Sequence, residues 1–107
     1  MKIILLIDTT SNKTIKVGLK RHGKEFMVEQ ELDKQKAQIV LRLIDKLLRK
    51  HNLKLKDIEA IQINPGPGSF TGIRVGLTIA NTLAFLLKIP LNGKSVGEPI
   101  EPIYERN

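Results

Sequence analysis

The segment 64–68, Asn-Pro-Gly-Pro-Gly, constrains the fold of this 107-residue chain more than any other part of it. Its two prolines lack the backbone N–H that helices and central strands require, and its two glycines can adopt positive φ angles. An element that precedes this segment must end at it, and the next element must begin after it. The stretch 58–63, which carries Ile61 and Ile63 on one face, precedes it and the mostly apolar stretch 69–88 follows, so we predict a shaped loop between a strand and a helix.

Two periodicities divide the rest of the chain into elements. The uninterrupted apolar run from Ile3 to Ile7 is typical of a central strand that is buried on both faces. Alternating residues then predict a hairpin that turns at Gly23, and spacings of three and four residues predict the first helix. The predicted order is strand 3–7, hairpin strands around 15–19 and 26–28, helix 34–51, strand 58–63, helix 69–88 and strand 91–96. This order predicts an α/β fold, a single lobe with a mixed five-stranded sheet and helices.

The chain offers little material for metal or nucleophilic catalysis. It has no cysteine, and its two histidines, His22 and His51, are far apart in the sequence and expected to be solvated. We therefore predict no catalytic residue, no metal site and no cofactor. The longest uncharged apolar run, 75–87, is shorter than the roughly 20 residues that span a bilayer. Because the N-terminus also lacks a signal-peptide pattern, we expect a soluble, cytoplasmic protein without membrane contact.

Positive charge is concentrated in the first half of the chain. Residues 1–56 carry a net charge of +8 and residues 57–107 a net charge of −1, which together give +7. One interpretation is a solvated, lysine-rich surface, and the other is a surface that faces a phosphate backbone or an acidic partner. No aromatic residue lies between clustered basic residues in the sequence, as a base-stacking surface would require.

The first predicted helix has a wider apolar arc than one contact surface needs. Six apolar positions form one stripe, and Ile39 and Leu43 widen the arc to roughly 200°, about twice the minimum for a surface helix. Ile39 and Leu43 would then flank a second surface for a partner. The alternative is a helix sunk deeply into its own core. The positions of the stripe are Ala37, Val40, Leu41, Ile44, Leu47 and Leu48.

Small residues recur at every fourth position of the second predicted helix. Such a ridge lets another helix come close, either a helix of a partner or this chain's own first helix. Arg74 stands in the first turn, where the helix dipole disfavours a cation. We therefore expect it to be held by Asp8 or by an acidic residue of another chain. The small residues, which we predict to form a partner interface with Arg74, are Gly72, Gly76, Ala80 and Ala84.

Residues that suit a phosphate group gather in two predicted loops. Asp8 ends the first strand and precedes hydroxyl side chains, and the loop 66–72 leads into a helix whose first N–H groups could face an anion. The alternative for Asp8 is structural, with its carboxylate accepting N–H bonds within a turn. The candidate phosphate-binding residues are Asp8, Thr9, Thr10, Gly66, Gly68 and Ser69.

The eleven residues 66–76, Gly-Pro-Gly-Ser-Phe-Thr-Gly-Ile-Arg-Val-Gly, resemble the signature of the TsaB (YeaZ-like) family. The segment 7–10, Ile-Asp-Thr-Thr, also resembles that family's first strand and turn. The resemblance implies an actin-like, ribonuclease-H-like lobe over residues 1–97, followed by an extended tail over 98–107. The second lobe that family members usually carry is not expected in this chain, which would be either a shortened homologue or a fragment.

The family serves in threonylcarbamoylation of tRNA, and the resemblance implies the same role here. The family's catalytic paralogue, TsaD, binds a metal through a His-x3-His pair, and the corresponding stretch of this chain, 34–39, has no histidine. The resemblance thus implies a non-catalytic scaffold that dimerises with a TsaD-like subunit through its helices and meets tRNA through that complex. A TsaE-like ATPase is a further expected partner, and a homodimer is expected when the chain is alone.

Two alternatives stand beside this role. Nucleotide sites of the actin-like superfamily lie between two lobes, so one lobe could supply half of an ATP-phosphate site that another chain completes. The lysine-rich first half could instead make the chain a basic tRNA-binding module. With a single lobe, we do not expect the chain to hydrolyse ATP on its own.

Overall fold

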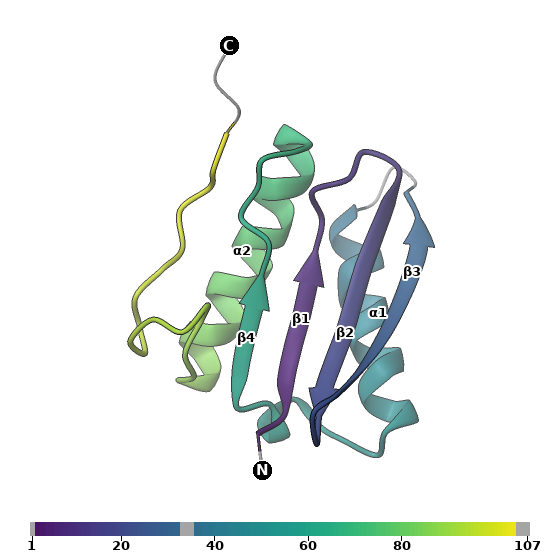
Figure 1. Ribbon diagram of the computed structural model, residues 1–107, viewed down its shortest axis with the longest axis vertical. Coiled ribbons are helices and arrows are strands. Elements are labelled where there is room, and N and C mark those ends of the chain that lie inside the picture. Colours follow the sequence, from purple (N-terminus) through teal and green to yellow (C-terminus); the bar gives the residue numbers. More distant parts are fainter. Residues whose placement is uncertain (1, 33–35, 105–107) are drawn as a thin grey trace.

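The computed structural model describes residues 2–32 and 36–104, and it places two helices against one face of a four-stranded sheet (Figure 1). The predicted α/β fold with a mixed sheet is thereby confirmed. The elements are β1 (Ile4–Asp8), β2 (Thr14–Arg21), β3 (Lys24–Glu31), α1 (Lys36–Lys50), a short 3-10 turn η1 (Leu55–Asp57), β4 (Ala60–Ile63) and α2 (Phe70–Leu87).

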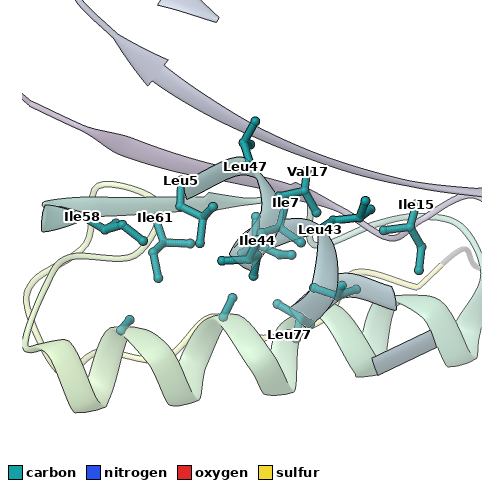
Figure 2. Packing of buried hydrophobic residues seen from close by; sticks show 14 of the residues in the cluster. Leu5, Ile7, Ile15, Val17, Leu43, Ile44, Leu47, Ile58, Ile61 and Leu77 are labelled. Atoms are coloured by element: carbon teal, nitrogen blue, oxygen red, sulfur yellow. The ribbon is translucent and has the colours of Figure 1, made fainter. Parts of the chain in front are cut away.

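The sheet has the strand order β3-β2-β1-β4. β1 pairs antiparallel with β2 and parallel with β4, and β2 and β3 form the predicted hairpin. Residues paired across strands share a face, so Leu5 lies beside Leu19 and Ile61 on the side of the helices. Figure 2 shows how side chains of these strands meet Leu43, Ile44 and Leu77 of the two helices in one apolar core.

β1 is buried on one face only, which corrects the prediction of a strand covered on both sides. Leu5 and Ile7 are buried, whereas Ile4 and Leu6 are half-buried. The reason is that α1 and α2 lie on the same side of the sheet (Figure 1), so neither covers the face that carries Ile4 and Leu6. An apolar run shows that both faces of a strand are hydrophobic, but it does not show whether the fold places helices on both faces of the sheet.

The predicted fifth strand over 91–96 is wrong, because the chain turns directly after Leu91. Leu91 forms a single parallel bridge with Ile61. Asn92 and Gly93 then take positive φ angles of 52° and 73°, which end the extended path. The Asn92 side chain replaces the missing strand: its Oδ1 accepts from the Ile63 N–H at 2.7 Å and its Nδ2 donates to the Ile63 carbonyl at 2.9 Å.

Both predicted helices are confirmed, although residues 34 and 35 of the first lie outside the described residues. α2 begins where the sequence requires, directly after the 64–68 loop. The Ser69 hydroxyl caps it by accepting from the Gly72 N–H at 3.2 Å. α2 ends at Leu87, because the next residue, Lys88, has a φ of 56°, which lies outside the helical region.

Residues 89–104 return along α2 and reach the loop at its other end. The Asn81 side chain holds this tail by pairing with both backbone groups of Ile100, at 2.9 Å and 3.2 Å. Further on, the Ile103 N–H donates to the Pro65 carbonyl at 2.8 Å. The tail therefore packs along α2 and is hydrogen-bonded to the loop that precedes this helix.

Candidate functional site

Three segments meet at one edge of the sheet, where β1 and β4 both end. These strands are parallel, so their carboxyl ends share that edge, and the turn after β1 lies beside the loop after β4 (Figure 1). The N-terminus of α2 follows the loop directly. The fold thus brings together all the predicted phosphate-binding candidates, which are Asp8, Thr9, Thr10, Gly66, Gly68 and Ser69.

The Asp8 carboxylate is held by hydrogen bonds within this edge. Its Oδ1 accepts from the Thr10 N–H at 2.9 Å and from the Thr10 hydroxyl at 2.7 Å, and its Oδ2 accepts from the Asn64 amide at 3.2 Å. Burial raises the pKa of Asp8, but these bonds and the charge of Lys16 outweigh it, so that the pKa lies below its usual value of 3.8. Asp8 is therefore an ionised turn residue at neutral pH, which matches the structural alternative for it.

This arrangement predicts an acid-dependent loss of stability through Asp8. Because its folded pKa is lowered, the contribution of Asp8 is fully present above about pH 4 and is lost as pH falls through the folded pKa. Asp8→Asn should lower the free energy of unfolding by about 1 kcal/mol at pH 7, since the Asn64 amide loses its acceptor. Urea denaturation from pH 7 to pH 2.5 should show the two proteins converging in acid. A constant difference over that range would contradict the prediction.

Three backbone N–H groups of the loop before α2 and of the first turn of that helix are hydrogen-bonded within the chain. The Gly66 N–H donates to the Asn64 side chain at 3.1 Å, and the Ser69 N–H donates to the Thr10 carbonyl at 2.7 Å. The Gly72 N–H is used by the Ser69 cap. Phosphate binding at this edge remains a prediction, with fewer N–H groups to support it than the sequence indicated. Within residues 2–32 and 36–104, no group of three His, Asp or Glu side chains is placed to hold a metal ion.

The small residues of α2 face this chain's own sheet edge. The Thr9 hydroxyl, buried in the turn after β1, donates to the Gly72 carbonyl at 2.6 Å. A Cβ at Gly72 would overlap the Thr9 carbonyl oxygen, and one at Gly76 would overlap the Thr9 side chain. The neighbour that needs these glycines is thus the turn after β1, and neither a partner's helix nor α1.

Six of the seven residues predicted for the partner interface are buried within the chain, which corrects that prediction. Ile39 is 0% exposed and Leu43 is 6% exposed, because α1 is sunk into the core as the alternative had it. The other four are small residues on the buried side of α2. The six buried residues are Ile39, Leu43, Gly72, Gly76, Ala80 and Ala84.

Arg74 is the exposed member of that set, and its partner is not Asp8. Its guanidinium lies 5.3 Å from the centre of the Phe70 ring, which in turn stacks on Tyr104 at 4.8 Å. Among the residues that the structure describes, no ion pair joins Arg74 to a carboxylate.

The outward face of α2 is the apolar surface that the sequence reasoning missed. Phe85 is 71% exposed and Leu86 is 67% exposed, and Val75 is half-buried. The signal available in the sequence was the small number of polar residues in the stretch 69–88. We define the outward face of α2 as Thr71, Arg74, Val75, Thr78, Thr82, Phe85 and Leu86, which recur at helical spacing.

This face carries one charge, whereas the outward face of α1 carries several, among them Arg42, Asp45, Lys46 and Arg49. By length and composition alone α2 could even cross a membrane, a test that core helices of soluble proteins also pass. Here α2 packs on the sheet through Ile73, Leu77 and Ala80. The larger exposed apolar surface therefore lies on α2, with Phe85 and Leu86, whereas α1 exposes Leu41.

Comparison with known proteins gives a consistent result. The family model described as TsaD: tRNA N6-adenosine threonylcarbamoyltransferase matches residues 27–95. The tRNA threonylcarbamoyladenosine biosynthesis protein TsaB of Haemophilus influenzae is 34% identical over 89 residues, which cover 83% of this chain and 38% of that protein. The tRNA N6-adenosine threonylcarbamoyltransferase of Syntrophus aciditrophicus is 37% identical over 73 residues, covering 67% of this chain and 22% of that protein.

The same likeness extends to solved structures. YeaZ from Pseudomonas aeruginosa matches with a TM-score of 0.80 and 29% identity, over 89% of this chain and 44% of that chain. This chain therefore spans less than half the length of each of these relatives.

Proposed function

Because this chain belongs to the TsaD family of tRNA N6-adenosine threonylcarbamoyltransferases and is a TsaB/YeaZ-like member of it, we propose that it serves in tRNA threonylcarbamoyladenosine biosynthesis. Its role in this proposal is that of a non-catalytic subunit that dimerises with a TsaD-like subunit. Contacts with tRNA and with a TsaE-like ATPase then follow from that complex. The setting for this assembly is the cytoplasm.

The observation that carries the proposal is the outward face of α2. Phe85, Leu86 and Val75 leave apolar surface in water that the chain's own sheet does not cover. Burial of such surface against another subunit stabilises a complex by roughly 25 cal/mol per Å². Arg74, fixed over Phe70 at the end of this face, offers a cation to an acidic residue of the partner.

The sheet edge at Asp8 supports a non-catalytic role. Asp8, Gly66 and Ser69 are engaged in bonds that join the turn after β1 to the loop before α2. The edge then serves to fix the start of α2, and with it the outward face of that helix. An ATP-phosphate half-site completed by another chain is the weaker candidate, because Asp8, Gly66 and Ser69 are already bonded within the fold. Calorimetric titration with Mg-ATP distinguishes the half-site from the non-catalytic role. Absence of binding heat, for the chain alone and in the complex, would exclude the half-site.

The test of the proposed interface introduces negative charge on the outward face of α2 and, as a control, on that of α1. Phe85→Glu with Leu86→Glu should weaken binding to a TsaD-like subunit by at least about 100-fold, since it puts two carboxylates at the centre of an apolar contact. The matched control is Leu41→Glu, which adds a carboxylate to the outward face of α1 at a residue that is 51% exposed. The control should bind within about threefold of the unaltered chain, as measured by biolayer interferometry.

The same face is expected to pair two copies when no partner is present. Sedimentation analysis at micromolar concentration should show a dimer for the unaltered chain and for Leu41→Glu, and a monomer for the double variant at residues 85 and 86. Equal binding to the TsaD-like subunit by the double variant and the unaltered chain would refute the proposed role of α2.

A further inference from the structure

The turn between β2 and β3 forms a basic groove with the C-terminal end of α1. The groove has a volume of about 410 Å³ and is open to solvent. We call it the hairpin groove and define it by its lining residues, which are Arg21, His22, Lys24, Phe26 and His51.

The fold assembles this groove from two segments that are distant in the sequence. Arg21 pairs with Lys24 and Leu19 pairs with Phe26 across the hairpin, so these side chains share the face of the sheet on which α1 packs. α1 ends at Lys50, and the next residue brings its ring to 4.7 Å from the ring of Phe26. Figure 1 shows the hairpin turn and the end of α1 at the same end of the molecule.

Positive charge in the groove is not balanced by a carboxylate of its lining. Glu25 is the nearest acid in the sequence, but it pairs with Lys20 and so lies on the opposite face of the sheet from Arg21 and Lys24. Within the described ranges, neither Arg21 nor Lys24 takes part in an ion pair. Among the described residues, the Arg21 guanidinium donates a single long bond, of 3.5 Å, to the His51 carbonyl.

The aromatic wall of the groove remains accessible beside these cations. Phe26 is 37% exposed although it is a large apolar residue on the helix side of the sheet. Its ring and that of His51 are inclined at 55°, so both present surface to the groove. Cations beside exposed aromatic rings are the combination with which proteins hold single-stranded nucleic acid, because the cations meet phosphates and the rings stack on bases.

We propose that the hairpin groove binds single-stranded RNA, with Arg21 and Lys24 on the phosphates and Phe26 and His51 against a base. An acidic peptide would use the cations but would leave the rings without a stacking partner. The groove lies where β1 begins, at the far end of the sheet from Asp8, and it is separate from the outward face of α2. The inference therefore stands or falls independently of docking onto a TsaD-like subunit.

The experiment measures binding of the chain to a fluorescein-labelled 12-nucleotide uridine RNA by fluorescence anisotropy. Phe26→Leu should weaken binding about tenfold, because it removes the stacking surface and keeps an apolar side chain. Phe26→Tyr, which keeps an aromatic ring at this position, should bind like the unaltered chain. Arg21→Gln with Lys24→Gln should weaken binding and should also lower the slope of log K against log salt by about 1.4, since about 0.7 is lost per phosphate contact with a single strand.

The matched control is Lys13→Gln with Lys16→Gln, which removes the same charge from exposed residues near the other end of β2. It should keep the affinity within about threefold. Three outcomes overturn the proposal: no binding by the unaltered chain, an equal loss in the control, or polyglutamate that displaces the RNA while Phe26→Leu has no effect. Circular dichroism melting establishes whether each variant is folded. If Phe26→Leu does not fold, the variant Arg21→Gln with Lys24→Gln still tests the proposal.

Discussion

Replacing Gly72 with alanine is expected to lower the free energy of unfolding by about 2–3 kcal/mol. A methyl group at this position would overlap the Thr9 carbonyl oxygen, which belongs to the backbone and cannot turn aside. α2 would have to move away from the turn after β1, and the 2.6 Å bond from the Thr9 hydroxyl to the Gly72 carbonyl would be strained. In an unconstrained helix, the same change would stabilise by about 1 kcal/mol.

Urea denaturation measures this loss, and Thr78→Ala is its matched control. Thr78 lies on the exposed side of the same helix, so alanine there should change the free energy of unfolding by no more than about 0.5 kcal/mol. A Gly72→Ala variant as stable as the unaltered chain would mean that α2 does not need its close approach to Thr9. The glycine would then have to be explained by contact with another molecule.

Asn92→Ala is expected to lower the free energy of unfolding by a similar amount, about 2–3 kcal/mol. The Asn92 side chain makes two hydrogen bonds, to the N–H and to the carbonyl of Ile63, and each contributes about 1 kcal/mol. Its φ of 52° adds a cost for alanine, which adopts the left-handed region less readily than asparagine. Loss of these bonds would leave the N–H and the carbonyl of Ile63, at the edge of β4, without the partners that Asn92 provides.

Asn52→Ala separates the two causes. Asn52 has nearly the same backbone angle, a φ of 56°, but it is exposed, and its side chain makes no hydrogen bond among the described residues. Asn52→Ala should therefore cost only the backbone part, about 1 kcal/mol. If both variants lose the same stability in urea denaturation, the bonds of Asn92 to Ile63 contribute nothing, and the account of β4's edge is wrong.

Much of the candidate site could be predicted from local sequence. Asp8 at the end of an apolar run and the Pro-Gly loop at 64–68 both follow parallel strands, so their meeting at one edge follows from topology. What could not be predicted is that the loop's N–H groups bond to Asn64, Thr10 and Ser69. Those bonds depend on how α2 is positioned against the turn after β1. No single segment of the sequence encodes that position.

The predicted interface failed for a related reason. Helical periodicity identifies which residues share a face, but it assigns no direction to that face. Ile39 and Leu43 widened the apolar arc of α1, and the core absorbed them because α1 is deeply set. Phe85 and Leu86 were not among the residues predicted for the interface, yet they are exposed, because the sheet reaches only one side of α2.

The sequence alone determined the two helices, the four strands of the sheet, the hairpin, the loop before α2 and the family. The reason is that backbone stereochemistry, hydrophobic period and an eleven-residue segment act over short distances. The tertiary structure alone decided which apolar face is left over, that Asn92 takes the place of a fifth strand, and that Phe26 meets His51 among basic residues. These outcomes depend on contacts between segments far apart in the chain, and burial belongs to a side chain only once its neighbours are in place.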